Sequence, residues 1–576
     1  MKRLFWSLLP LVALIALPLM LRKEAEKIDV TADQLVIVSP HNESIRYEYE
    51  QAFRKYYTEV TGRRLSIDWR APGGTGDAVR YVNSSFVASF KDYWTRELGR
   101  AWSDEVEAAF MNRKLKPGMP GWEAREAFLS SDVGIGIDLF FGGGQYDLNR
   151  QAQQGTLTPT GLRDPDSKLY RGDPEGWLYG RLDEARRQAL YPSREREPEP
   201  SLHRELFGER PQILQAVGGE VWYDPEDRYY GTCFSSFGIC ENVDRLRALG
   251  FEFAEGDYPL KSWRDLADPR LFGQVGAADP TKSGSINKCF EMMIQRGMQD
   301  SYARNEAQVR SGAMTEREAL DQAWQDAMVL IKQIGGNSSY LTFSASKVPV
   351  DVASGQVAAG MSIDFYGQSQ AEWEERHVGR RTMYYHTPLG ESSVSTDPIG
   401  IFRGAPHAEA ARLFVRFVMS HRGQRLWNQA VGTEGGPVKY NLHRLPVRRD
   451  SYGPEERRLM LAPEAEPFRQ ADSFQYHGSW TGAYFGLIQM LVKVMVLDCQ
   501  DELRGAWKAI IDAGGPQAVP EAHAAFSQLP FRHHEGFEVM AKAGTSARAR
   551  TEMLREWTIF FKRQYTLARE LAAQGK

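Results

Sequence analysis

The chain has 576 residues, of which 42% are hydrophobic and 25% charged, an ordinary composition for a globular protein of roughly two to four domains. The formal net charge of -4 is small, and the basic residues are dispersed among acidic ones, so nothing indicates a nucleic-acid partner. The absence of any CxxC pair argues against a zinc site built on cysteine. We expect buried free thiols, or a disulfide if the compartment is oxidising, at the four cysteines Cys233, Cys240, Cys289 and Cys499.

An uncharged, largely apolar run from Leu4 to Leu21 lies between two pairs of basic residues. A basic start followed by such a run is typical of an export signal. No A-x-A-like cleavage site follows, and the run is close to the shortest length that spans a bilayer. We therefore predict a signal-anchor and tether over residues 1–33, with the body of the protein periplasmic or otherwise outside the cytoplasmic membrane. A cleaved signal peptide is the alternative, and a cytoplasmic protein with a buried first helix is the least favoured.

The first folded unit is a strand, a tight turn and a helix. Residues 35–38 are four apolar residues that predict a buried parallel strand, and apolar residues recur at helical spacing over 45–56. Ser39 and Asn42 are good helix N-caps. The turn presents polar side chains and backbone N–H groups at the carboxyl end of a strand, where ligands bind in open α/β sheets. From this turn we expect ligand contacts at Ser39, His41, Asn42 and Glu43.

Two more predicted strands end in glycine-rich turns. Residues 65–69 alternate between apolar and polar, and the turn 71–77 leads into a helix over 78–86 that Thr75 or Asp77 can cap. No Gly-Lys-Ser/Thr follows, which excludes a P-loop. An apolar run over 133–141 predicts a buried strand that ends in three glycines, followed by a helix over 145–154. Glycines let the backbone approach a ligand, so we expect contacts at Gly74, Thr75 and Gly143.

Two segments of this first part are predicted to be insertions. Residues 87–130 are amphipathic and helical, with a Pro-Gly break over 116–121. Residues 161–220 are charged, bear prolines and have weak periodicity, which favours a surface insertion.

The next stretch carries a family resemblance. Residues 228–240 are extended, Asn242 begins a helix, and the motif SWRDLADPRLFG follows over 262–273. This succession resembles the solute-binding proteins of ABC importers, in which W-x-D-L-x-D-P-x-x-x-G opens the second lobe. The resemblance covers roughly 34–148 and 221–445, and it rests on the order of the motifs more than on any one of them. It continues through the segments 278–285, 333–337, 352–366, 396–402 and 405–427.

The resemblance implies the two-lobed α/β fold of the type II periplasmic binding proteins, with a cleft between the lobes. Alternating strand and helix patterns independently indicate an α/β class with a mostly parallel sheet. The helical patterns over 480–513 and 546–573 predict a helical C-terminal extension packed on the lobes, with a partner-binding surface as the alternative. The expected domains are a first lobe over 34–230, a second lobe over 231–384, a return segment over 385–445 and the extension over 446–576.

The resemblance implies binding by hinge closure, without catalysis and without a cofactor, and a membrane ABC permease as the partner. It is closest to the branch that binds ferric iron or small phosphorylated and phosphonate compounds. In ferric-binding members adjacent tyrosines hold the metal, often with a histidine and a carboxylate, because hard Fe(III) suits oxygen ligands. His41 and Tyr366 match that set, whereas Phe365 stands in place of the first tyrosine and glycine stands in place of the carboxylate.

The other ligand hypothesis is an anionic organic solute held by short neutral donors and backbone N–H groups. Asp364 would then accept from a sugar hydroxyl or an amine. Besides the residues of the first three turns, the expected ligand contacts are Ser235, Ser236, Ser283, Gly284, Ser285, Asp364, Tyr366 and Asp397.

An enzyme is a weaker alternative. Residues 344–347 match S-x-x-K, and residues 282–284 resemble K-T-G, the pair used by penicillin-binding enzymes. In those enzymes S-x-x-K comes first and opens a helix, whereas here the order is reversed. An exported ligand-sensing protein and a structural envelope protein are the remaining alternatives.

Overall fold

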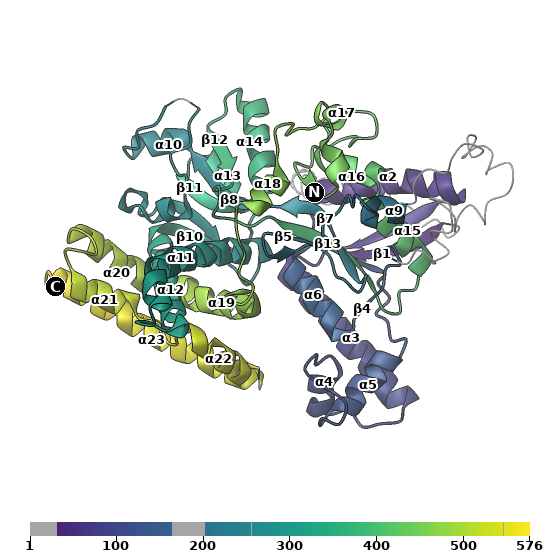
Figure 1. Ribbon diagram of the computed structural model, residues 1–576, viewed down its shortest axis with the longest axis horizontal. Helices are drawn as coiled ribbons and strands as arrows, with labels where there is room; N and C mark the ends of the chain where they lie inside the picture. The colour runs from purple at the N-terminus through teal and green to yellow at the C-terminus, as the bar shows by residue number, and fades with distance from the viewer. Residues whose placement is uncertain (1–31, 164–201, 255, 545) are drawn as a thin grey trace, which may run out of the picture.

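The computed structural model describes residues 32–163, 202–254, 256–544 and 546–576. They form two α/β lobes and a C-terminal layer of helices that lies against the second lobe (Figure 1). The predicted signal-anchor and most of the 161–220 insertion lie outside the described residues, so both stay predictions.

The first lobe is built on a seven-stranded sheet with the order β14-β7-β13-β3-β1-β2, with β4 paired to β13. Strands β1, β2 and β3 are parallel, and β13 runs antiparallel to β3 and β7. The strands are β1 (Asp33–Val38), β2 (Leu65–Arg70), β3 (Leu139–Phe141), β4 (Leu157–Thr158), β7 (Tyr229–Ser235), β13 (Ser395–Phe402) and β14 (Leu445–Pro446). The main helices are α2 (Glu43–Thr61), α3 (Thr75–Asp92), α6 (Gln145–Gln154), α15 (Ala408–Met419) and α16 (His421–Asn428).

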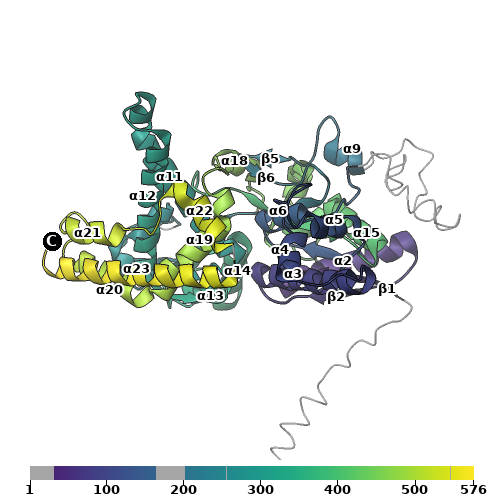
Figure 2. The same cartoon turned by 90° about the horizontal axis from the view of Figure 1, so that it is seen from below.

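The second lobe is built on a five-stranded sheet with the order β10-β9-β11-β8-β12. Its strands are β8 (Phe237–Asn242), β9 (Val275–Ala278), β10 (Ser338–Thr342), β11 (Ala359–Ile363) and β12 (Met383–His386). Its helices are α10 (Val243–Ala248), α11 (Gly284–Arg310), α12 (Glu316–Asn337), α13 (Lys347–Ala353) and α14 (Asp364–Val378). Helices α11 and α12 form a long hairpin that projects from the lobe (Figure 2).

The chain passes between the two sheets at Ser236, which separates β7 from β8, and returns over residues 387–394 between β12 and β13. Two mixed α/β lobes joined by crossing segments, with helices at the C-terminus, confirm the predicted fold class. The first crossing lies slightly beyond the expected boundary after Tyr230, because Gly231–Ser235 still pair with β13.

The N-cap predicted at Asn42 and the helix predicted over 145–154 are confirmed. Asn42 caps α2, and its Oδ1 accepts a hydrogen bond from the backbone N–H of Ile45. Gly155 ends α6 in the left-handed conformation. The strand predicted over 133–141 is wrong in its first half, since only Leu139–Phe141 pair with neighbours. The buried Asp138 explains the late start, because its carboxylate accepts hydrogen bonds from backbone N–H groups of two other segments.

The 87–130 insertion is helical. Helix α3 continues to Asp92 and is followed by a π-helical turn, η1 (Tyr93–Glu97), and by α4 (Asp104–Phe110) and α5 (Trp122–Ser130). Aromatic side chains from these elements pack on one another and on Val38, Phe140 and Phe402 of the sheet, so the insertion is an ordered part of the first lobe.

The single helix predicted over 480–513 is wrong. The chain forms α19 (Phe485–Val492), a π-helical segment η6 (Lys493–Asp498) and α20 (Gln500–Asp512), with a bend of 71° at Cys499. Among the residues described, no single helix is long and apolar enough to cross a membrane, and this bent pair alone meets the criteria of length and composition. In the folded chain the apolar side chains of the pair are largely buried against the rest of the protein.

The helix predicted over 546–573 is present as α23 (Ala547–Ala573), with Ser546 as its N-cap. It packs along α20 and α21 (Pro520–Ser527), and α20 in turn packs on α12 of the second lobe. Short helices α18 (Pro467–Asp472) and α22 (Gly536–Ala543) complete the C-terminal region. Four buried free thiols are also found: Cys233, Cys240, Cys289 and Cys499.

Candidate ligand-binding cleft

A cleft lies between the two lobes, at the carboxyl ends of their parallel strands. Its outer chamber has a volume of about 650 Å³. First-lobe turns after β1, β2 and β3 form one wall, and second-lobe turns after β9, β10 and β11 form the other. The walls of this outer chamber include Pro40, His41, residues 73–75, Gly143 and Asp397 on one side. On the other side they include residues 282–285, residues 343–346, Ile363, Phe365 and Tyr366.

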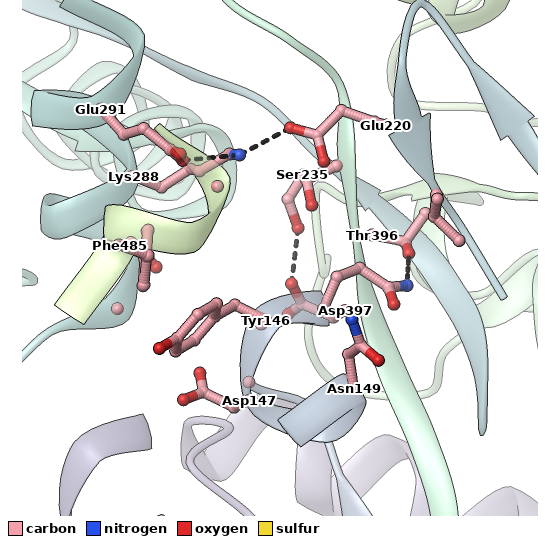
Figure 3. A pocket seen from close by; sticks show the side chains of 18 of the residues that line it. Tyr146, Asp147, Asn149, Glu220, Ser235, Lys288, Glu291, Thr396, Asp397 and Phe485 are labelled. Carbon is pink, nitrogen blue, oxygen red and sulfur yellow. Dashed lines mark hydrogen bonds and ion pairs between the residues drawn. The ribbon is translucent and has the colours of Figure 1, made fainter. Parts of the chain in front are cut away.

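The cleft continues into an inner chamber of about 280 Å³ (Figure 3). The inner chamber is walled by α6, by the short hairpin β5 (Ala216–Val217) and β6 (Glu220–Val221), by α11 and by the C-terminal segment around Tyr476 and Phe485. The two chambers share six residues: Thr75, Gly143, Gly284, Ser285, Ile363 and Asp397.

Two helices from opposite lobes begin at the outer chamber. Helix α3 starts at Thr75 and α11 starts at Gly284, and a Cβ on Gly284 would lie 3.6 Å from the Cβ of Thr75. A Cβ on Gly74 would overlap the carbonyl oxygen of Lys282, so glycine is required there by the close approach of the lobes. The first turn of a helix has N–H groups without intrahelical partners and a positive dipole end, and both favour an anion.

Lys282 adds a positive charge to the outer chamber. Its side chain is half-buried, and within the described part of the chain no carboxylate forms an ion pair with it. Asp77 of α3 lines the opposite, first-lobe wall but pairs with Arg80. The outer chamber therefore combines an unopposed ammonium group with two helix N-termini.

The floor of the cleft is a buried chain of alternating charges. His41 Nε2 lies 3.2 Å from Asp397 Oδ2, and the fully buried Arg444 lies 2.5 Å from the same oxygen. Arg444 Nη1 also lies 3.5 Å from Asp364, whose carboxylate accepts from the backbone N–H of Ser236 at 2.8 Å. Arg444 thus connects a first-lobe carboxylate to a second-lobe carboxylate beside the crossing segment.

The protonation states follow from these contacts. Burial acts to raise the pKa of Asp397, but attraction to Arg444 and hydrogen bonds from His41 and Ser235 outweigh it and lower that pKa to about 2. Burial lowers the pKa of His41. A neutral His41 beside an ionised carboxylate must carry its proton on Nε2, which leaves the buried Nδ1 without a hydrogen-bond partner among the described residues.

Most of the expected contact residues meet at the cleft, and five do not. Ser39 donates to the carbonyl of Phe141, Asn42 is occupied in capping α2, and Glu43 is exposed outside the chambers. Ser236 and Asp364 bond to each other below the floor. The expected residues that line one or both chambers are His41, Gly74, Thr75, Gly143, Ser235, Ser283, Gly284, Ser285, Tyr366 and Asp397.

Several residues of the cleft were not predicted. Lys282 was seen only as part of a K-T-G-like motif, and nothing in the sequence pairs Arg444 with the acids it neutralises. Glu291 in the wall of the inner chamber could have been found from the sequence, because it belongs to a row of polar residues that recur every four positions on one face of α11. The polar and aromatic residues of the site that were not predicted include Tyr146, Asp147, Glu220, Lys282, Lys288, Glu291, Arg444, Tyr476 and Phe485.

The metal hypothesis stays a prediction. His41 and Tyr366 both line the outer chamber, but in the described ranges no group of three or more His, Cys, Asp or Glu side chains is arranged to hold a metal. Burial raises the pKa of Tyr366, with a smaller opposing effect of Arg444, so its phenol keeps its proton more firmly than usual. Within the S-x-x-K motif, Lys347 pairs with Asp351 and not with Ser344.

Comparison with known proteins agrees with this architecture. Residues 253–430 match the family model of bacterial extracellular solute-binding proteins. The matched segment holds most of the second lobe and the return into the first, including Ser283–Ser285 and Asp397 of the cleft walls. Family members are binding proteins, in keeping with a cleft between two lobes.

Two proteins of similar sequence and one of similar structure are compared with the chain. An uncharacterized protein of Haemophilus influenzae is 25% identical over 237 residues, 39% of this chain, and the chain spans 58% of its length. The phosphoglycerate transport regulatory protein PgtC of Salmonella typhimurium is 22% identical over 339 residues, 58% of this chain and 71% of its own. The structure of periplasmic binding protein AfuA from Actinobacillus pleuropneumoniae, with fructose-6-phosphate bound, is 16% identical with a TM-score of 0.39, covering 68% of this chain and 81% of that one.

Proposed function

We propose that this solute-binding protein captures a small anionic organic solute in the outer chamber and delivers it to an ABC permease. The solute class is a phosphorylated, phosphonate or carboxylate compound, and residues 1–33 anchor the protein to the outer face of the cytoplasmic membrane. The observation that supports this most is the meeting of α3 and α11 at their N-termini beside Lys282, whose ammonium has no counter-ion in the described part of the chain.

The electrostatics favour an anion over a cation. The carboxylate of Asp397 is already neutralised by Arg444, so the charge left in the outer chamber is that of Lys282. A hydrogen bond to a charged group contributes about 1.5–3 kcal/mol, and each helix N-terminus adds about 0.3–1 kcal/mol. A ligand that contacts α3 and α11 together binds the closed arrangement better than an open one, and this differential affinity drives hinge closure.

The Salmonella relative guides the choice of probe. Its name refers to phosphoglycerate, a compound with a phosphate and a carboxylate. A solute of that kind places one anionic group at the helix N-termini and extends its remaining atoms toward the inner chamber. Serine and threonine side chains on the shared wall, Thr75 and Ser285, supply neutral donors to such a group.

Isothermal titration of the full chain in detergent tests the proposal. The probes are inorganic phosphate, 3-phosphoglycerate, a sugar phosphate, an alkylphosphonate and ferric citrate. We expect a phosphorylated or phosphonate probe to bind and Lys282→Met to weaken that binding by about 10–100-fold, the loss of one charge-assisted contact. Lys508→Met, which removes an exposed lysine on α20, is the matched control and should bind as the native chain does. Binding of ferric citrate alone would refute the anionic-solute assignment.

A ligand-sensing role is the second candidate, because the Salmonella relative is named as a transport regulatory protein. Uptake of the identified solute separates the two roles. A delivery protein is required for uptake in cells that already express the permease, whereas a sensor is required only for induction of the permease.

A further inference from the structure

The C-terminal segment 471–485 passes from the first lobe to the second across the inner end of the cleft. We refer to it as the strap. It is a third covalent connection between the lobes, in addition to Ser236 and residues 387–394. Figure 3 shows its end at Phe485 facing the inner chamber, opposite Glu220 of the first-lobe hairpin.

The strap holds the second lobe through a polar stripe on α11. Asn287, Glu291, Gln295 and Gln299 recur every four residues, so they share one face of the helix, and the first three are fully buried. Gln295 Nε2 donates to the carbonyl of His477 at 2.8 Å and to Thr481 Oγ1 at 2.7 Å. Asn287 donates to the carbonyl of Phe485, Gln299 donates to that of Gln475, and Glu291 accepts from the hydroxyls of Tyr476 and Thr481.

The contact of the strap with the first lobe is smaller. The backbone N–H of Tyr476 donates to the carbonyl of Gly218 at 2.7 Å. Gly218 and Gly219 both have positive φ, and a Cβ on either would overlap carbonyl oxygens of the strap. The hairpin that carries these glycines belongs to the first lobe, since the backbone of Trp222 next to it bonds to β7.

A cluster of three charged side chains also joins the first-lobe hairpin to α11. Lys288 Nζ lies 2.6 Å from Glu220 of the hairpin and 2.8 Å from Glu291 of α11 (Figure 3). Burial acts to lower the pKa of Lys288, but attraction to the two carboxylates outweighs it and raises that pKa, so the ammonium stays charged. Ser393, in the return crossing, donates to Glu220 as well.

We infer that the strap and the Glu220–Lys288 ion pair form a lock that restrains opening of the two lobes. Because the strap makes several hydrogen bonds to α11 and few to the hairpin, it moves with the second lobe. Opening therefore breaks the junction at Gly218 and Glu220 and leaves the α11 face intact. The lock also makes the strap the inner wall of the cleft, so ligand exchange takes place through the outer chamber.

Pulsed electron–electron double resonance, which measures the distance between two spin labels, tests the lock without any ligand. Spin labels on K55C in α2 and A248C in α10, both exposed positions, report the separation of the lobes in the full chain. Glu220→Gln removes the charge that holds Lys288 and keeps the side-chain shape. We expect the ratio of open to closed populations to rise by about tenfold or more, the consequence of losing a charge-assisted contact.

The control is Glu306→Gln on α11, the helix that carries Lys288, where an exposed glutamate pairs with Arg310 away from the strap. It should leave the distance distribution unchanged. Gly218→Ala is the second test of the lock if Glu220→Gln fails to fold. Tyr476→Phe removes one strap hydroxyl and keeps the ring. This variant should leave the lobe separation unchanged, because its bond lies on the α11 side, whereas Gly218→Ala should open the lobes.

An unchanged distance distribution in both Glu220→Gln and Gly218→Ala would overturn the lock. The readout needs no solute, so it is independent of the proposed ligand. A chain that opens as expected yet binds none of the anionic probes would leave the lock standing and refute the proposed function.

Discussion

Gly74→Ala should separate the lobes at the mouth of the cleft without harming the fold of either. Gly74 has φ -70° and ψ 176°, values that alanine adopts without strain, so the backbone itself tolerates the change. The new Cβ would overlap the carbonyl oxygen of Lys282 in the opposite lobe, by about 1 Å inside ordinary contact. Backbone cannot move aside as a side chain does, so the lobes must separate.

The substitution should raise the free energy of the closed arrangement of the lobes alone. Overpacking of this size costs about 1–3 kcal/mol, which corresponds to about a 5–150-fold weaker affinity for a ligand that requires closure. The thermal midpoint should change by only a few degrees, because the open arrangement relieves the overlap. Titration calorimetry with the bound anionic probe gives the affinity and differential scanning calorimetry gives the midpoint.

Gly453→Ala is the control, because its nearest atom would lie at 3.6 Å and its φ is -65°. Equal affinity in Gly74→Ala and the native chain would refute the idea that the solute is held between closed lobes. A large fall in the midpoint would instead mean that Gly74 is needed within its own lobe.

Two further predictions concern the buried charges. Arg444→Met leaves Asp397 and Asp364 without their shared cation, and we expect a loss of about 3–5 kcal/mol in the free energy of unfolding, measured by urea denaturation at pH 7.5. Burial raises the pKa of Asp147 to about 6, so the folded state disfavours its ionised form and stability falls as the pH rises from about 4 through 6. Asp147→Asn should therefore be more stable than the native chain at pH 7.5, by about 1–2 kcal/mol because solvent partly screens this half-buried group, and equal to it below pH 4. A difference that persists at low pH would contradict the assignment to Asp147.

The turns at the strand ends were predictable because each depends on a short stretch of consecutive residues. An apolar run fixes a buried strand, and glycine or serine after it fixes a turn and a helix start, as at residues 73–75, 142–144 and 283–285. The order of these units then indicated two lobes and a cleft. Asn42 was wrongly expected to contact the ligand. Its side chain accepts the N-cap hydrogen bond of α2, so a polar residue in a ligand-facing turn need not face the ligand.

Contacts between distant segments were not predictable from one sequence. Arg444 reaches Asp397 and Asp364 from a loop that follows the segment 253–430 matched by the family model, and no local pattern indicates such a pairing. The bend at Cys499 replaces an apparently continuous helix because packing on α12 overrides helical periodicity. The polar stripe from Asn287 to Gln299 is the exception: its four-residue spacing was visible, and only the strap explains why it is buried.

The central claim is that an anion is held between α3 and α11 beside Lys282. Its most direct test is the heat of binding of 3-phosphoglycerate, a sugar phosphate and an alkylphosphonate to the native chain and to Lys282→Met, at one salt concentration. The account predicts saturable binding of at least one of these anions and a loss of about 10–100-fold in the variant. No binding of any anion, or equal binding by both chains, would contradict it.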